Sequence, residues 1–333
     1  MKTKHAKSPC CYALVYRFGH RRRQCSACKR TWSIRQKKRG RPRIRMQSDI
    51  LKQVFLEKYT LGHLAKRRHG MNIATFRYRF RQVLHRFASG PTPQRLPSGS
   101  LILLVDGLYF RFKKIPWVLY LIALKSCTGK KAIFLDPVLL PGKESAIQWR
   151  LVLTTRLSQE IKSRIRALVV DNLNGMKKIA KQEGWILQLC HFHLILKFQV
   201  QHRRQRRALK GGVLREKAYH LMHQILEVPS GHLLDTSITE LNQLAQNPSM
   251  TYRIQAVIRE FISSVNYYRT YLNNPELNLP STTNTIESMC CIIRDLLRRN
   301  RSASSPRALL KWATALIRLR KELNCNGKHR QQN

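Results

Sequence analysis

Three acidic residues have neighbours that suit metal-dependent chemistry: Asp106, Asp171 and Glu287. Asp106 follows the five aliphatic residues 101–105, and Asp171 follows Ala-Leu-Val-Val. An acid at the end of a buried apolar run carries a desolvation cost that a partner must offset. If the three carboxylates meet, they form an all-oxygen site that suits Mg²⁺ or Mn²⁺, and two such ions would assist an in-line displacement at phosphorus. Taken singly, Asp106 is equally well explained as a turn or helix-cap residue.

The elements around these acids alternate between strands and helices. Continuous apolar runs of this length are typical of strands buried on both faces. The first three strands are joined by short turns, which predicts an antiparallel meander. The order of elements is that of an α/β, ribonuclease H-like domain, in which the fourth strand lies parallel to the first, so that Asp106 and Asp171 stand side by side. The predicted strands are 101–112, 116–125, 131–138, 166–171 and 185–190, and the predicted helices are 143–160, 174–183 and one after 190.

The rest of the chain is expected to serve this domain. Residues 100–196 would form the first part of the catalytic domain. Residues 197–279 lose the strand pattern and are very basic, which predicts a helical insertion. Residues 280–323 then form the closing helices that carry Glu287, and the tail after Asn324 is expected to fray.

The composition indicates a polyanionic partner. Lys and Arg total 63 against 17 Asp and Glu, which gives a net charge of +46 over 333 residues. A folded chain with this imbalance repels itself unless its charge is neutralised, and nucleic acid phosphates bind Lys and Arg regardless of sequence. A basic, non-catalytic protein of the ribosome or chromatin type has the same bias. Here, however, the basic residues are interleaved with strongly apolar segments.

The cysteines and the apolar runs indicate the compartment. Nine cysteines, an odd number without an obvious disulfide framework, indicate a reducing compartment. The longest apolar runs, such as 117–124, are far too short to span a membrane, and the N-terminus lacks a clean signal peptide. We therefore expect a soluble cytoplasmic protein that does not associate with a membrane.

Residues 1–46 are predicted to form a zinc-ribbon-like segment followed by a basic stretch. Cys25 and Cys28 make a C-x-x-C knuckle, and a tetrahedral zinc site needs a second pair of ligands. Ser8 stands where a Cys-Pro-x-Cys half-site would have its first cysteine, so the identity of the second pair is open. A plain pair of free thiols at the knuckle is the alternative. The candidates for the second pair are Cys10, Cys11, His5 and His20, and the favoured zinc set is Cys10, Cys11, Cys25 and Cys28.

The basic stretch contains the sequence Lys-Lys-Arg-Gly-Arg-Pro-Arg at 37–43. Its core resembles an AT-hook, in which the glycine lets the backbone approach the floor of the minor groove. Arg39 and Arg41 would lie along that groove, where A·T tracts concentrate negative potential. A solvated basic linker explains the same residues equally well.

Residues 47–90 are predicted to be a helix-turn-helix DNA-binding region. Amphipathic stretches precede a turn at Gly70, and Asn72 is placed to cap the last helix. That helix would be the recognition helix in a major groove. An ordinary helical hairpin is the alternative, and the basic residues of the last helix favour DNA. The residues offered to the DNA would be Thr75, Arg77, Tyr78, Arg79 and Arg81.

Five segments, in order, resemble those of bacterial insertion-sequence transposases of the Mutator-like group, which carry a DDE catalytic triad. The resemblance covers roughly residues 100–320. The five segments are Leu-Val-Asp-Gly-Leu-Tyr-Phe-Arg at 104–111, Gly-Lys-Glu-Ser-Ala-Ile-Gln-Trp at 142–149, Val-Val-Asp-Asn-Leu-Asn-Gly at 169–175, Gln-Leu-Cys-His-Phe-His at 188–193 and Thr-Thr-Asn-Thr-Ile-Glu-Ser at 282–288.

The resemblance implies that Asp106, Asp171 and Glu287 are the catalytic ligands of Mg²⁺ or Mn²⁺. It implies cleavage at transposon ends and joining of the freed 3′-hydroxyl to target DNA. The implied partner is double-stranded DNA, which includes both the terminal repeats and the target. A homo-oligomer is expected because two ends must be cut together.

The family's Cys-x-x-His signature falls on Cys190 and His193. One interpretation is a packed thiol and a hydrogen-bonded imidazole, and the other is support for the DNA strand or for the second aspartate. Asp136 precedes a proline and is interpreted as a turn residue. The pair 290–291 and the two tryptophans 149 and 185 are expected to pack.

Two further functions compete with transposition. A transposase-derived repressor would keep the ribbon and the helix-turn-helix but would not cut DNA. The complete set of acids argues for activity, whereas Ser8 in the ribbon argues mildly for decay. A ribonuclease or structure-specific nuclease on the same fold is less favoured, because the span from Asp171 to Glu287 is long and the N-terminal DNA-binding region is large.

Overall fold

The computed structural model divides into two compact units, Met1–Gln47 and Ser48–Asn333. The first unit contains a three-stranded antiparallel sheet in the order β1-β2-β3. Its strands are β1 (Val15–Phe18), β2 (Arg22–Cys25) and β3 (Thr31–Ser33). The structure describes residues 7–19, 22–33, 49–67, 70–91, 96–196, 198, 212–300 and 304–325.

A seven-stranded mixed sheet forms the centre of the second unit. Its strands follow the order β10-β6-β5-β4-β8-β9, and β7 pairs separately with β5. The pairing of β4 with β5 is antiparallel, whereas β4 with β8 and β8 with β9 are parallel. The strands are β4 (Leu101–Phe112), β5 (Ile115–Ser126), β6 (Lys131–Phe134), β7 (Val138–Pro141), β8 (Ile165–Val170), β9 (Ile186–Leu189) and β10 (Glu322–Asn324).

The interior strands lie where the apolar runs predicted them, and the predicted parallel pairing of the first and fourth strands is confirmed. Residues 101–105 are fully buried because helices cover both faces of the sheet there. The predicted strand 131–138 is wrong as one element, because it is two strands with Pro137 between them. Proline has no N–H for a sheet ladder and breaks the pairing. Asp136 lies in this break, and its carboxylate pairs with Arg318 at 2.6 Å.

Helices on the sheet include α4 (Ala146–Arg156), α5 (Gln159–Arg164) and α6 (Met176–Glu183). The predicted helix 143–160 is therefore two helices. They separate at Ser158, whose hydroxyl accepts from the backbone N–H of Ile161 and caps α5. Trp149 is fully buried and packs edge-on against Tyr120 with ring centroids 4.7 Å apart.

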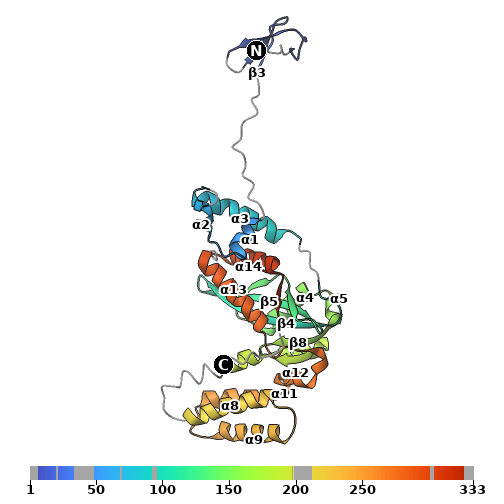
Figure 1. Ribbon diagram of the computed structural model, residues 1–333, viewed down its shortest axis with the longest axis vertical. Helices are drawn as coiled ribbons and strands as arrows, with labels where there is room; N and C mark the ends of the chain where they lie inside the picture. The colour runs from blue at the N-terminus through green and yellow to red at the C-terminus, as the bar shows by residue number, and fades with distance from the viewer. Residues whose placement is uncertain are drawn as a thin grey trace. The chain divides into compact units, whose positions relative to one another are not determined.

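A helical segment follows β9, as predicted. Residues 191–196 are helical, and α8 and α9 then pack side by side (Figure 1). Within 212–279, all the secondary-structure elements that the structure describes are helices. Its elements are α8 (Gly212–Glu227), α9 (His232–Gln246), α10 (Tyr252–Ile262), α11 (Val265–Tyr268), α12 (Thr270–Asn273) and the 3₁₀ helix η1 (Pro275–Leu277).

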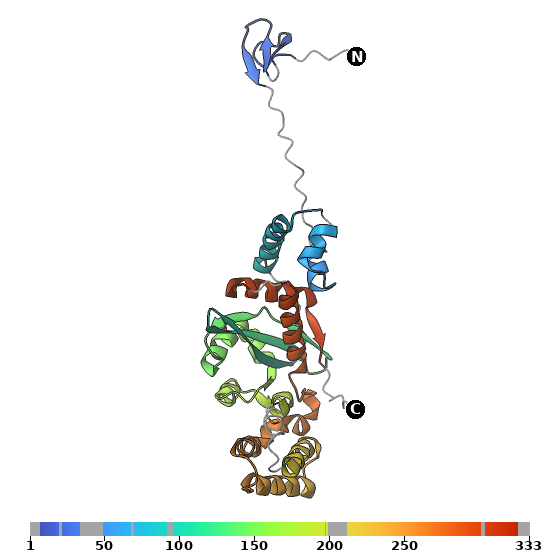
Figure 2. The ribbon, with the colours of Figure 1, turned by 90° about the vertical axis from the view of Figure 1, so that its left-hand side faces the viewer.

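Two long helices, α13 (Asn284–Asn300) and α14 (Pro306–Arg320), close the unit. The helices α1 (Asp49–Phe55), α2 (Leu61–Arg67) and α3 (Ile73–Ser89) belong to the same unit. Figure 2 shows α14 between these helices and the sheet. The rings of Phe55 and Phe80 lie 5.1 and 5.4 Å from the ring of Trp312 on α14. None of the helices in the described part of the chain is both long and apolar enough to cross a membrane.

Candidate active site

Asp106 lies within β4, and Asp171 comes directly after β8. The parallel register pairs Leu104 with Val169, two residues before each aspartate. The observed pairing ends there, and each aspartate follows two residues later on its own strand or directly after it, at the C-terminal end of β8. The two apolar runs therefore position both acids, because each run is a buried central strand.

Glu287 joins Asp106 from a distant element. It lies in the first turn of α13, where its own N–H donates to the carbonyl of Thr283. The positive end of a helix dipole favours a carboxylate at this position. One side-chain ligand atom from each of Asp106, Glu287 and His193 lies within 4.8 Å of the other two. We call these three residues the carboxylate cluster.

His193 connects the two acids of the carboxylate cluster. Its Nε2 lies 2.9 Å from Oε1 of Glu287 and 3.9 Å from Oδ2 of Asp106. Burial alone would lower the pKa of His193, but its interactions with Cys190, Glu287 and Asp106 raise it to about 11. The imidazole therefore favours its protonated form, and its positive charge faces the Glu287 carboxylate.

The two carboxyl groups respond in opposite directions. Burial raises the pKa of Asp106 well above its usual value, and the neighbouring charge of Glu287 adds to the effect. The hydrogen bond from His193 lowers the pKa of Glu287. One acid of the cluster thus prefers its protonated form and the other its ionised form, which is the arrangement expected when two carboxylates share a buried site.

Asp171 lies outside the carboxylate cluster and is exposed. Its Oδ1 accepts from the N–H of Asn172 at 2.6 Å, and Asn172 in turn donates to Glu260 of α10 at 3.0 Å. The structure therefore brings together two of the three predicted acids with His193. The third acid, Asp171, is not part of this group.

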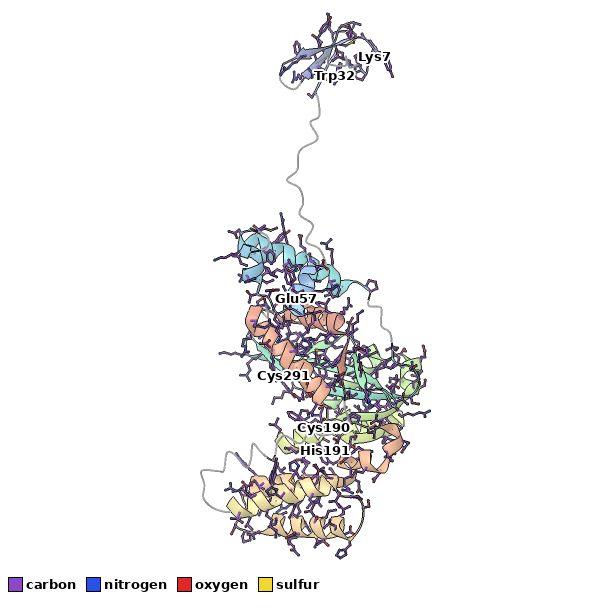
Figure 3. The ribbon with its side chains drawn as sticks, viewed as in Figure 1. Lys7, Trp32, Glu57, Cys190, His191 and Cys291 are labelled. Atoms are coloured by element: carbon purple, nitrogen blue, oxygen red, sulfur yellow. The ribbon has the colours of Figure 1, made fainter. Side chains whose placement is uncertain are left out.

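Cys190 ties the end of β9 to the segment before Glu287. Its buried thiol lies 3.2 Å from the hydroxyl of Thr283 and accepts from the Thr283 N–H at 3.2 Å. Beside it, the His191 N–H donates to the carbonyl of Ser281 at 2.9 Å. Figure 3 labels Cys190 and His191 at this junction. These bonds fix where α13 begins, and so fix the position of Glu287.

The two neighbouring cysteines on α13 differ from each other. Cys290 is buried beneath the cluster, as predicted, and burial raises its pKa. Cys291 is exposed and does not pack, so that part of the prediction is wrong. The helical period explains the difference, because adjacent residues on a helix point about 100° apart. Figure 3 labels Cys291 on α13.

Glu144 is a fourth acid at this end of the sheet, and no role was predicted for it. It accepts from the hydroxyl of Tyr109 at 2.9 Å and from Nε1 of Trp149 at 2.7 Å. Burial raises its pKa, and Asp171 and His193 are close enough to affect it. A Cβ atom on Gly107 would lie 2.7 Å from the Glu144 carboxyl carbon. The glycine beside Asp106 therefore makes room for this acid.

The cysteines of the first unit form a second cluster. The sulfur atoms of Cys10, Cys11, Cys25 and Cys28 all lie within 4.8 Å of one another. A tetrahedral zinc ion with Zn–S bonds of about 2.3 Å needs sulfur atoms roughly 3.8 Å apart. The four thiols fit a metal ion such as zinc. Cys10 thus takes the ligand position that the missing first cysteine left open.

Ser8 has a different role in this cysteine cluster. It is buried, and its hydroxyl accepts from the Cys25 thiol at 3.2 Å and from the Cys11 N–H at 3.3 Å. When Cys25 is ionised, the Ser8 hydroxyl can donate to the thiolate instead, and this hydrogen bond is the main reason that the pKa of Cys25 falls to about 6. Ser8 therefore supports the thiolate form that a metal requires. His5 and His20, the other predicted candidates, lie outside the described residues.

A helix, α3, lies where the last helix of the helix-turn-helix was predicted. The carbonyl oxygen of the Asn72 side chain accepts from the N–H of Ala74 at 2.8 Å, which is the predicted cap. The helix buries Phe76, Phe80 and Leu84. Of the residues predicted to meet DNA, Thr75, Arg77, Tyr78 and Arg81 are exposed and Arg79 is half-buried against Met71, while Arg39 and Arg41 of the AT-hook-like stretch lie outside the described residues.

No protein-family model matches this chain, and no curated protein matches it in sequence.

Proposed function

We propose that this chain is a DDE-type DNA transposase, which cleaves DNA at transposon ends and joins the freed 3′-hydroxyl to target DNA. The observation that carries the proposal is the meeting of Asp106 and Glu287. They come from the central strand and from a late helix, yet they share one cluster at the end of the sheet. Asp171 follows β8, the strand that pairs in parallel with the Asp106 strand β4, which supports its assignment as the third acid.

The strand order supports a ribonuclease H-like catalytic domain. In chain order, β6, β5, β4, β8 and β9 are the third, second, first, fourth and fifth main strands of the sheet. This arrangement has an antiparallel meander, followed by two parallel strands that return beside the first. The helices from α8 to η1 then form an insertion before α13, which carries Glu287.

Asp106, Asp171 and Glu287 would hold Mg²⁺ or Mn²⁺, because carboxylate oxygens are the ligands that these ions prefer. Such ions activate the attacking oxygen and stabilise the leaving oxygen in phosphoryl transfer. His193 orients the Glu287 carboxylate through its hydrogen bond. Glu144 is not a ligand in this proposal, because Tyr109 and Trp149 already bind its carboxylate.

The charge of the chain supports DNA as the partner. A net charge of +46 suits a protein that binds the phosphates of DNA. The exposed basic face of α3 would contact the terminal repeats, and the cysteine cluster would hold Zn²⁺ as a ribbon. A homo-oligomer would pair two transposon ends. Such a protein would work on nucleoid DNA in the cytoplasm.

One observation favours a second candidate, a DNA-binding protein derived from a transposase that no longer cuts. His193 already satisfies the charge of Glu287 at 2.9 Å. A cluster that is neutralised by its own imidazolium would be stable without metal, as expected of a relic.

Cleavage of an end-labelled duplex that carries the flanking inverted repeats distinguishes these candidates. With Mg²⁺ or Mn²⁺ we expect nicking at the repeat end, and with EDTA no nicking. Glu287→Gln should lower the cleavage rate about 10³-fold or more, or about 4 kcal/mol in barrier, while DNA affinity stays within about threefold. Asp106→Ala serves as a second inactive variant. Equal cleavage by Glu287→Gln would remove Glu287 from the site, and tight repeat-specific binding without cutting under any metal would favour the repressor.

A further inference from the structure

A basic cavity lies between α3 and the start of α14. Its volume is about 550 Å³, and it is lined by residues of α2, α3, α13 and α14. Arg77 and Arg81 enter it from α3, and Arg307 and Lys311 enter it from α14. Each pair is separated by four residues, so the two side chains of a pair lie on one face of their helix. We call this site the basic cavity, and its four cationic side chains are those of Arg77, Arg81, Arg307 and Lys311.

No carboxylate lines this cavity. In the described part of the chain, none of its four cations forms an ion pair with an acidic residue. Other arginines of the same helices are paired: Arg318 on α14 with Asp136 at 2.6 Å, and Arg299 on α13 with Asp295 at 2.9 Å. Four converging positive charges without a counter-charge repel one another, and a bound anion relieves that repulsion.

The lining decides which part of a nucleic acid fits. Phe80, Leu84 and Trp312 form the apolar part of the lining, but each is at most 5% exposed. The rings of Phe80 and Trp312 pack against each other between α3 and α14, so they offer no open platform for stacking a base. What the cavity presents is positive charge, which suits phosphate oxygens.

The N-terminal end of α14 offers few free backbone N–H groups to an anion in the cavity. Pro306 has no N–H, and Ser305 accepts from the N–H groups of Ala308 and Leu309 through its hydroxyl and its carbonyl. Only the amide of Arg307 is left for an anion in this first turn. The affinity of the cavity therefore comes from the four side chains.

We propose that the basic cavity binds the phosphodiester backbone of duplex DNA. Arg77 and Arg81 then position DNA without reading its bases, which differs from the role of a recognition helix in a major groove. The inference deepens the proposed function, since it assumes that DNA is the partner.

The cavity also gives a distance to the chemistry. Asn300, at the end of α13, lines the cavity, and Glu287 lies in the first turn of the same helix. Thirteen residues of α-helix span roughly 20 Å at 1.5 Å per residue. That is about the length of six base pairs. A backbone that followed α13 from the cavity would reach the carboxylate cluster after about half a helical turn of DNA.

The test compares DNA binding by charge variants of the full chain, in EDTA so that no cleavage occurs. Fluorescence anisotropy would give Kd for a duplex with the terminal repeat and for a duplex of random sequence, at several salt concentrations. For Arg307→Gln/Lys311→Gln we expect affinity about 10-fold or more lower on both duplexes, and a slope of log K against log salt shallower by about 1.8. Arg298→Gln is the control, because its side chain is 83% exposed and lies outside the cavity.

Arg77→Gln/Arg81→Gln should give a similar loss on both duplexes. The fourfold variant should lose less than the product of the two double losses, because the four side chains serve the same phosphates. Thermal unfolding checks that each variant is folded. A loss on the repeat duplex alone would show base reading and overturn the inference, as would unchanged affinity and slope. Because catalysis plays no part, a chain that binds in this way but never cuts would leave the inference standing while the transposase proposal fails.

Discussion

The cysteine cluster and the carboxylate cluster bring their candidate metal ligands together in opposite ways, one from nearby and one from distant positions in the sequence. The four cysteines lie within 19 residues of sequence, in and beside a three-stranded sheet, and the only buried residues described in this unit are Ser8 and Cys25. The carboxylate cluster draws on residues from 106 to 287, and it sits on the main hydrophobic core. A metal bound to the cysteine cluster would stabilise the fold around it. The fold around the carboxylate cluster is already stabilised by the hydrophobic core, and it would position ligands for a metal.

The largest expected effect is therefore the loss of metal from the cysteine cluster. Cys25→Ser, or chelation of the wild type, should unfold β1, β2 and β3, because the described residues of this unit form no apolar core and structural zinc sites supply folding free energy of about 10 kcal/mol or more. The unit from Ser48 onward should unfold at an unchanged temperature. The ¹⁵N–¹H amide spectrum of the full chain and its zinc content would measure both.

Cys291→Ser is the matched control, because Cys291 is an exposed cysteine outside the cluster. It should keep its zinc and its spectrum. Well-dispersed amide signals for 15–33 in metal-free protein would contradict this half of the comparison.

The carboxylate cluster should respond in the opposite direction. Asp106→Asn should stabilise the metal-free protein at pH 7 by about 1–3 kcal/mol, since burial penalises the ionised form that Asp106 has in the unfolded chain at this pH, whereas the amide has a similar shape and no charge. Because burial raises the pKa of Asp106, the folded state binds the proton more tightly than the unfolded chain does. The wild type therefore loses stability as the pH rises from about 3.8 through the raised pKa of Asp106. Below about pH 3.8, the stability advantage of Asp106→Asn should vanish.

Urea unfolding between pH 3 and pH 8 would measure this difference. Added Mg²⁺ or Mn²⁺ should stabilise the wild type and not the variant, because a ligand stabilises only the state that binds it. Asp295→Asn is the control: the hydrogen bond from Arg298 lowers the pKa of this exposed acid, so its loss should be neutral or slightly destabilising. A wild type more stable than Asp106→Asn at pH 7 without metal would overturn the interpretation.

A smaller effect would sharpen the role of Glu144. Gly107→Ala should destabilise the protein by about 1–3 kcal/mol, because the new methyl group would meet the Glu144 carboxyl carbon at 2.7 Å. Gly62→Ala on α2 has nothing within 4 Å and should be neutral or stabilising by about 0.5–1 kcal/mol. Urea unfolding measures both.

Adding Glu144→Ala to Gly107→Ala should recover part of the loss, as the clash would be gone. Full additivity of the two substitutions would show that the methyl group meets something other than Glu144.

The sequence predicted the central strands well because their apolar runs are continuous and buried on both faces. Residues 101–112 and 165–170 needed no tertiary information, and their parallel pairing followed from the order of elements. The third predicted strand was wrong because the run crosses Pro137. The short β10 was missed, because a three-residue strand of Glu-Leu-Asn has no periodicity to detect.

The candidate site was only partly predictable. Glu287 could be proposed from its segment, but its contact with His193 depends on how the helix after β9 packs against α13. Glu144 had no signal beyond its place in a helix start. The choice of Cys10 as a fourth cysteine depended on local backbone geometry around Ser8, which spacing does not determine. Long-range contacts were thus the part that the sequence left open.

The pairing of β10 with β6 has a consequence for the behaviour of the protein in solution. Without β10, the outer side of β6 would present unpaired N–H and C=O groups, which can template the addition of a strand from another molecule. Leu323 pairs with Ala132 there, and the N–H of Cys325 donates to the carbonyl of Lys130. The last described strand thus protects the sheet against edge-to-edge aggregation.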